Sequence, residues 1–296
     1  MTPMPPPAND GLSKDVHIVT GPLFNPPKKI PSEKEVLQAP NISNCYLAAM
    51  LAAHAFTPNG RTFIQNMVTE TAGNVLTDLS GIKQALSNPG ADTLASNRFF
   101  TVKLPGTVRF KLPPHTDRPS GAVTASDGAL ELTGGSLDVS DVLYTNDSDH
   151  NWSILYLSDP VDHTIWAAVI EKAVAVRMGG YQNFDALRWN DADKTGIPVN
   201  NVWEMVTGSS PGGFAITPQT SPSAITDAAK ASVNVPTIAA TQENIPSGSS
   251  LPSHHGLAMW GLKDGKLRLY DPAEAKEIFI SADDFRKGGV IAILHT

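Results

Sequence analysis

The sequence is poor in several features that would each point to a class of protein. Cys45 is the single cysteine among 296 residues, which excludes an internal disulfide bond and agrees with a reducing compartment. No apolar run approaches the ~18 residues of a membrane-spanning helix, and the longest covers only residues 46–53. With a formal net charge of −7, the chain lacks the basic surface that nucleic acids select. We therefore expect neither a membrane nor a nucleic acid as a partner.

Charge is scarce as well, whereas proline and glycine are plentiful. Charged residues make up 17% of the chain, and its 24 prolines and 23 glycines are typical of a loop-rich globular protein. Residues 1–30 are proline-rich and lack the charged and apolar regions of a secretory signal. We interpret them as a partly disordered arm. We expect a cytoplasmic protein, or a secreted effector exported without a cleaved signal peptide.

Motifs for several other chemistries are missing or fail their context. The chain has no phosphate-binding loop, dinucleotide fingerprint or paired-cysteine zinc site. The run Gly208-Ser209-Ser210-Pro211-Gly212 matches the nucleophile elbow of serine hydrolases, but its proline and glycines do not permit the helix that must follow. Residues 191–196 open like a calcium-binding EF-hand loop, but Val202 replaces the required glutamate. We expect no cofactor and no metal, and calcium has no support here.

The single cysteine stands where a helix is expected to begin. A turn at Pro40-Asn41 precedes it, Ser43 or Asn44 can cap the helix, and an apolar run follows. A thiol at a helix N-terminus lies at the positive end of the macrodipole, which favours the reactive thiolate. Cys45 is therefore a candidate nucleophile.

A nucleophilic thiol needs a base, and the strongest candidate is His255. It precedes an apolar run, and the Asp264-Gly265 pair that follows is a two-residue hairpin signal. His255 and Asp271 flank that turn at nearly equal distances, so the two side chains should face each other and the acid should orient the imidazole. His54 falls on the opposite face of the cysteine helix. His254 is a rival base, but alternation along a strand turns its side chain to the other face.

Between these motifs the pattern predicts a mixture of helices, strands and loops. Helices are expected from Cys45 and at residues 62–68, 79–86 and 165–177, and a strand at residues 142–145. Alternation over residues 99–112 suggests a hairpin around Pro105-Gly106. Residues 207–253 are rich in Ser, Thr, Pro, Gly and Ala, and predict a long loop with a short helix at 226–232. Because this loop leads to His255, we expect it to rim and gate the site.

Five segments resemble calpain-family cysteine proteases, which have a papain fold. The run Asn44-Cys45-Tyr46-Leu47-Ala48-Ala49 resembles the family's Asp-Cys-Trp-Leu-Leu-Ala-Ala segment, and residues 165–175 followed by Gly179-Gly180-Tyr181 resemble its Leu-Trp-x-x-Leu-Leu-Glu-Lys-Ala-Tyr-Ala helix and Gly-Ser-Tyr end. The strand from His255 is similar to the family's His-Ala-Tyr-Ser-Val-x-Gly, with Gly261 in step. Residues 267–272 and the closing segment from residue 280 follow in the family's order, so the resemblance runs from about Gln38 to the C-terminus.

Several positions depart from the family. The family's oxyanion glutamine lies six residues before its cysteine, whereas Gln38 lies seven before Cys45, and Asn41 is an alternative donor. Asp271 stands where the family has asparagine, which keeps an acceptor for the imidazole and adds a charge. The family's tryptophan after Asn-Pro, which shields the His–Asn pair, is replaced by Ala273. The family's calcium-binding acidic loops have no match, which favours calcium independence.

The resemblance implies an α+β, papain-like fold of two subdomains. Residues 31–179 would form a helical N-terminal lobe that carries the nucleophile, and residues 180–296 a β-rich lobe that carries His255 and Asp271. The implied activity is that of a cysteine endopeptidase with a Cys45–His255–Asp271 triad, and with the Cys45 N–H and Gln38 as oxyanion donors. The partners would be a protein or peptide substrate, and an inhibitor or immunity protein is a further candidate.

Two other functions stay open at this point. The same triad serves transglutaminases and deamidases, in which a protein glutamine is the acyl donor. Asp271 favours this alternative mildly, whereas the calpain-like Glu171-Lys172-Ala173 helix favours the protease more strongly. A catalytically silent binding module on a protease fold is the second, and the intact Cys, His and acid argue against it.

Overall fold

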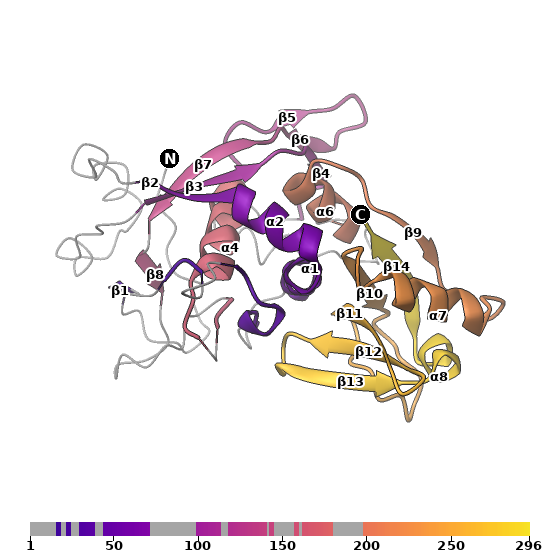
Figure 1. Cartoon of the computed structure of the whole chain (residues 1–296). Coiled ribbons are helices and arrows are strands. Elements are labelled where there is room, and N and C mark those ends of the chain that lie inside the picture. The colour runs from indigo at the N-terminus through magenta and orange to yellow at the C-terminus, as the bar shows by residue number, and fades with distance from the viewer. Residues whose placement is uncertain are drawn as a thin grey trace.

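The computed structural model describes residues 16–18, 22–24, 30–38, 44–71, 99–113, 118–140, 142–144, 157–159, 162–179 and 198–296. These residues form a mixed α+β protein, as predicted, whose sheets are antiparallel (Figure 1). Of the predicted arm, only residues 16–18, 22–24 and 30 fall among them. The helix predicted at 79–86 and the loop at 191–196 lie outside the described residues.

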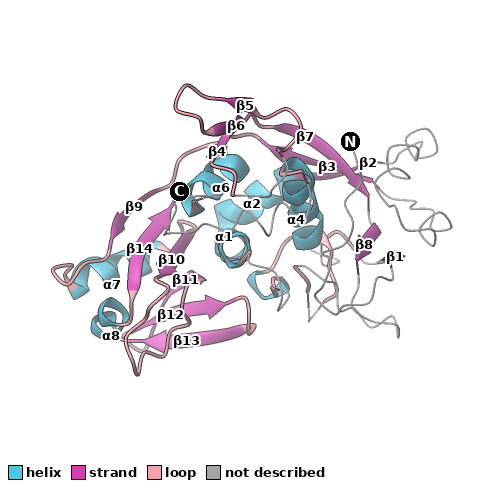
Figure 2. Ribbon diagram, turned by 180° about the vertical axis from the view of Figure 1, so that it is seen from behind, coloured by secondary structure: helices cyan, strands magenta, loops and turns pink. Residues whose placement is uncertain are grey.

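The C-terminal part is built on a six-stranded sheet in the order β13-β12-β11-β10-β14-β9. Its strands are β9 (Gly212–Ala215), β10 (Thr237–Thr241), β11 (Gly256–Lys263), β12 (Lys266–Asp271), β13 (Lys276–Ile280) and β14 (Val290–His295). Along the central strand β11, successive side chains alternate between two buried faces, as a strand period of two requires. Leu257 and Met259 of β11 join the core under α7 (Pro222–Ala231) and α8 (Ala282–Lys287), whereas Ala258 and Trp260 join the core around α1. Figure 2 shows α7 and α8 on the side of the sheet away from α1.

Helix α1 (Cys45–Phe56) lies at the centre of the molecule. Nearly all of its residues are buried, so it has no polar face, and its many alanines let other elements approach closely. It lies between the sheet and the helices α2 (Pro58–Met67), α4 (Trp166–Arg177) and α6 (Val199–Thr207) (Figures 1 and 2). At its C-terminal end Phe56 stacks on Trp260, with ring centroids 5.5 Å apart. The central helix therefore connects the two parts of the chain.

The described residues of the N-terminal part form strands as well as the helices that were predicted. Residues 31–179 carry the short helix η1 (Glu33–Glu35), α1, α2 and α4, but also two three-stranded sheets. One consists of β2 (Val68–Thr71), β3 (Phe99–Leu104) and β7 (Gly135–Ser140), and the other of β4 (Val108–Phe110), β6 (Leu130–Leu132) and β5 (Val123–Thr124). Strand β1 (Val16–Ile18), within the predicted arm, pairs with β8 (Val142–Tyr144), which matches the strand expected at 142–145. Helix α6 packs into this core although it follows the predicted boundary at residue 180.

Two local predictions are wrong for identifiable reasons. The strands β3 and β4 do not form a hairpin around Pro105-Gly106, because β3 pairs with β2 and β7 while β4 pairs with β6. The chain instead turns against α6, where the Gly106 N–H donates to the Met205 carbonyl at 3.1 Å. Residues 207–253 are also not a long loop, since they contain the strands β9 and β10, although α7 covers most of the short helix predicted at 226–232. Their small residues suit close packing, as the fully buried Ala229 and Ala239 illustrate.

Other local predictions agree with the structure. The Asp264-Gly265 turn has φ angles of 52° and 75° and joins β11 to β12, as an Asp-Gly hairpin requires. Helix α4 covers almost all of the predicted 165–177. Helix α2 begins earlier than predicted, because Pro58 starts the helix and Thr57 caps it by accepting the Gly60 N–H at 3.1 Å.

A glycine lets the first turn of α1 lie directly against β11. A Cβ atom on Gly256 would be 3.0 Å from the Cys45 carbonyl oxygen and 3.0 Å from the Tyr46 Cα. Both neighbours are backbone atoms of a buried helix and cannot move aside cheaply. The absence of a side chain at Gly256 thus places the residue before it, His255, beside Cys45.

We expect Gly256→Val to lower the free energy of unfolding by about 1–3 kcal/mol, because the new side chain overpacks this contact. The measurement is urea denaturation. The matched control is Gly135→Val, since a Cβ at that strand position would meet nothing within 4 Å. Equal stability of the two variants would show that the approach at Gly256 is not as tight as described.

Candidate active site

Cys45 is the first residue of α1 and is partly exposed. Its Sγ donates to the carbonyl of His254, 3.9 Å away, so the thiol points toward the loop that leads into β11. As the first helical residue it cannot donate its N–H within the helix. Among the described residues this N–H has no hydrogen-bond partner. The sulfur and an available N–H donor are therefore adjacent.

His255 and Asp271 face each other across the ends of β11 and β12, as predicted. The imidazole Nε2 lies 2.9 Å from Asp271 Oδ1, and the same oxygen accepts the Ala273 N–H at 2.9 Å. The two side chains are only 10% and 3% exposed, so the pair is covered from solvent. Because Nε2 is engaged by Asp271, Nδ1 is the ring nitrogen available to Cys45.

The electrostatics of the site favour a charged imidazole. Burial alone would lower the pKa of His255, but its hydrogen bond to Asp271 and its hydrogen bond and charge interaction with Cys45 outweigh burial and raise the pKa to about 9. Burial likewise acts to raise the pKa of Asp271, yet the hydrogen bond and charge of His255 keep it below its ordinary value. The structure thus brings Cys45, His255 and Asp271 into one interacting group.

The backbone on either side of His255 is held in place by β10. The Thr241 hydroxyl accepts the His255 N–H at 2.9 Å and donates to the Pro252 carbonyl at 2.7 Å. His254 has a positive φ of 48°, a left-handed conformation that is uncommon outside glycine. This conformation accompanies the orientation of its carbonyl toward Cys45. Sequence reasoning did not single out Thr241, because a threonine at a strand end carries no distinguishing signal.

Gln38 is buried close to the acid of the group. Its backbone N–H donates to the Pro272 carbonyl at 2.8 Å, and the Tyr270 hydroxyl donates to the Val36 carbonyl at 2.7 Å. These bonds tie the segment before the cysteine to the end of β12. Asn41, the alternative amide donor, lies outside the described residues.

His54 is excluded as the base by its position. It lies in the last turn of α1, fully buried, and its Nδ1 is 2.9 Å from the Met50 carbonyl. Burial lowers its pKa to about 4, so it is a neutral residue of the core.

A buried acid that the sequence motifs did not single out lies behind the cysteine. Glu171 of α4 accepts a hydrogen bond from the side-chain amide of Asn44 and the Leu157 N–H at 2.6 Å. A glutamate inside the apolar helix Trp166-Ala167-Ala168-Val169-Ile170 was the available signal.

One acidic group among the described residues has metal-ligand spacing. Oxygen atoms of Glu35, Asp159 and Asp162 lie within 4.8 Å of one another. Glu35, however, accepts the Trp166 Nε1–H at 2.6 Å, and both oxygens of Asp159 accept bonds in the turn before α4. Hydrogen bonds within the fold thus already occupy carboxylate oxygens of Glu35 and Asp159.

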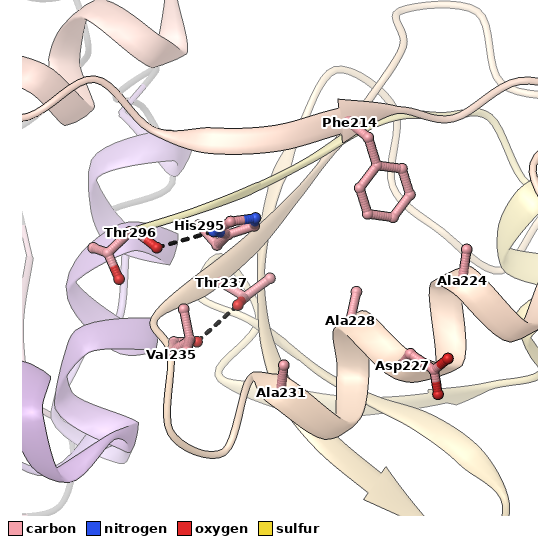
Figure 3. Close-up of a pocket in the computed structure, with 9 residues that line it drawn as sticks. All are labelled: Phe214, Ala224, Asp227, Ala228, Ala231, Val235, Thr237, His295 and Thr296. Carbon is pink, nitrogen blue, oxygen red and sulfur yellow. Dashed lines mark hydrogen bonds between the residues drawn. The ribbon is translucent and has the colours of Figure 1, made fainter.

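A separate cavity lies on the α7 face of the sheet (Figure 3). Its volume is about 350 Å³, and it is lined by Phe214, Ala224, Asp227, Ala228, Ala231, Val235, Thr237, His295 and Thr296. None of the three interacting residues contributes to it. The Ser210 motif is likewise remote from nucleophile-elbow geometry, because the helix α6 precedes it and the strand β9 follows it.

A scan against protein-family models and a search of curated proteins gave no match for the chain. Within the described residues, every helix is too short or too polar to cross a bilayer.

The His255–Asp271 pair predicts a pH-dependent stability. The raised pKa of His255, about 9 against an ordinary 6.5, means that its stabilisation is complete below pH 6.5 and is lost as the pH rises through 9. The depressed pKa of Asp271 means that its contribution is lost in acid. We expect the difference in free energy of unfolding between wild type and Asp271→Asn to be largest between about pH 5 and 6.5, as measured by urea denaturation. A difference that does not change between neutral and alkaline pH would contradict this assignment.

Proposed function

We propose that the chain is a calpain-like cysteine endopeptidase with a papain-type fold. The observation that carries the proposal is the continuous contact from Asp271 through His255 to Cys45, with the cysteine at a helix N-terminus. The five segments that resemble calpains support the same function. Its substrate would be a protein or peptide, and the mechanism below needs no metal.

In the first half of the reaction, Cys45 acts as the nucleophile. Its thiolate attacks the peptide carbonyl carbon, a carbon–sulfur bond forms, and the carbonyl electron pair moves to the oxygen. The Cys45 N–H is placed to donate to this oxyanion, and Gln38 is the candidate second donor. The His255 imidazolium then gives its proton to the amine as the carbon–nitrogen bond breaks.

The second half releases the acyl group. The now neutral His255 takes a proton from water, whose oxygen attacks the thioester carbonyl, and the Cys45 thiolate leaves. Asp271 holds the imidazole by Nε2 throughout, so that Nδ1 faces the sulfur. As a carboxylate it also stabilises the imidazolium more strongly than an amide would.

Asp271 supports a second candidate on the same intermediate. If the acyl donor were a glutamine side chain, ammonia would leave when the acyl-enzyme forms. Attack by water on that thioester would then make the group a deamidase, and attack by an amine would make it a transglutaminase. The cleaved bond and the acceptor differ between the two functions, whereas the roles of Cys45 and His255 do not.

Thiol alkylation tests the proposed group without a known substrate. At pH 6.5 we expect iodoacetamide to label Cys45, and His255→Ala to slow the labelling by about 10²-fold. The matched control is His295→Ala, at the cavity on the α7 face of the sheet, in which Cys45 should be labelled as fast as in the wild type. Labelling that is independent of His255 would contradict the assignment of His255 as the base that activates Cys45. Mass spectrometry of a proteome incubated with wild type or Cys45→Ala, with and without calcium, then distinguishes peptide cleavage from loss of ammonia.

A further inference from the structure

The residue before the nucleophile has an unusual hydrogen-bonding arrangement. Asn44 is the N-cap of α1, yet its side chain makes no capping bond to the helix. It is 1% exposed, and its Nδ2 donates instead to Glu171 Oε1 on α4. Its Oδ1 has no partner among the described residues, so Glu171 is the anchor of this side chain.

Glu171 is itself completely buried and doubly bonded. Besides Asn44, it accepts the Leu157 N–H at 2.6 Å. Burial raises the pKa of Glu171 to about 8, so the carboxyl is mostly neutral at pH 7. A neutral acid can hold Asn44 without placing a negative charge behind the thiol, where such a charge would disfavour the thiolate.

The first turn of α1 is thus fixed from two directions. On one side it lies against the backbone of Gly256, next to His255. From α4, Glu171 holds Asn44, whose own carbonyl accepts the Leu47 N–H at 2.9 Å and the Ala48 N–H at 3.1 Å. Cys45 follows Asn44 directly, so a shift of the Asn44 side chain displaces the sulfur relative to the imidazole.

We propose that Glu171, acting through the Asn44 side chain, is the positioning residue that holds Cys45 against His255. This inference rests on the proposed function, since it concerns the same thiol and imidazole. A structural role accounts for the bond that Glu171 accepts from the Leu157 N–H, but not for its second bond, which holds the residue directly before Cys45. The hydrogen bond between Asn44 and Glu171 does not cap α1, so its effect is to position the first turn of that helix.

The test compares alkylation of Cys45 by iodoacetamide at pH 6 and pH 9 in variants of the full chain. A thiol held in an ion pair stays reactive at pH 6, whereas an isolated thiol is about 10²-fold less ionised at pH 6 than at pH 9. We expect Asn44→Ala and Glu171→Leu to lower the ratio of the labelling rate at pH 6 to the labelling rate at pH 9 by about tenfold or more. Glu171→Gln should retain the ratio, since its carbonyl can accept the Leu157 N–H while its NH₂ donates to a rotated Asn44 amide.

Ser232→Ala controls for loss of stability. It removes a buried hydroxyl that accepts the Gly261 N–H at 2.9 Å on the far side of the sheet, and should leave the ratio unchanged. Rates are taken on the folded fraction measured by circular dichroism, so a variant that unfolds changes the amplitude and not the ratio. A wild-type ratio in both Asn44→Ala and Glu171→Leu, with labelling still dependent on His255, would overturn this inference alone. Labelling independent of His255 in the wild type would overturn the proposed function and this inference together.

Discussion

The structure depends on the contact between the first turn of α1 and the start of β11. Gly256 brings the two backbones together, so that a residue from the front of the chain meets one from near its end. Hydrophobic packing buries both elements independently of any catalytic role, since α1 is apolar on all sides and β11 packs on both faces. The core of the protein therefore determines the distance between Cys45 and His255, and a flexible loop does not.

Burial alone does not decide the charge of a histidine in this protein. Both His54 and His255 are largely removed from solvent, yet the pKa of one falls to about 4 while that of the other rises to about 9. His54 has a backbone carbonyl and aromatic rings around it, which give no charge to offset desolvation. His255 has Asp271 and Cys45, and their attraction exceeds the cost of burial. The same reasoning explains why Glu171, with neutral partners, tends to stay protonated.

Much of the site, but less of the fold, was predictable from the sequence. Helix start signals identified the position of Cys45, and the Asp264-Gly265 turn fixed the register that brings His255 to Asp271. The strands β3 and β4 were recognised by their alternation, but their partners depend on tertiary packing that alternation does not encode. The polar and small residues of 207–253 suggested a loop. In the structure the small residues instead allow α7 and β10 to pack closely. Glu171 and Thr241 act through contacts distant in sequence: a glutamate in an apolar helix indicated that Glu171 is unusual but not what it bonds, and no local pattern indicated Thr241.

The central claim is that the imidazole of His255 is charged because it interacts with both Asp271 and Cys45. Nuclear magnetic resonance titration of histidine-labelled protein measures this directly, by comparing wild type with Cys45→Ala. The account predicts a His255 pKa of about 9 in the wild type and a lower value once the sulfur is removed. Identical titration of His255 in the two proteins, or a wild-type pKa below the ordinary 6.5, would contradict it.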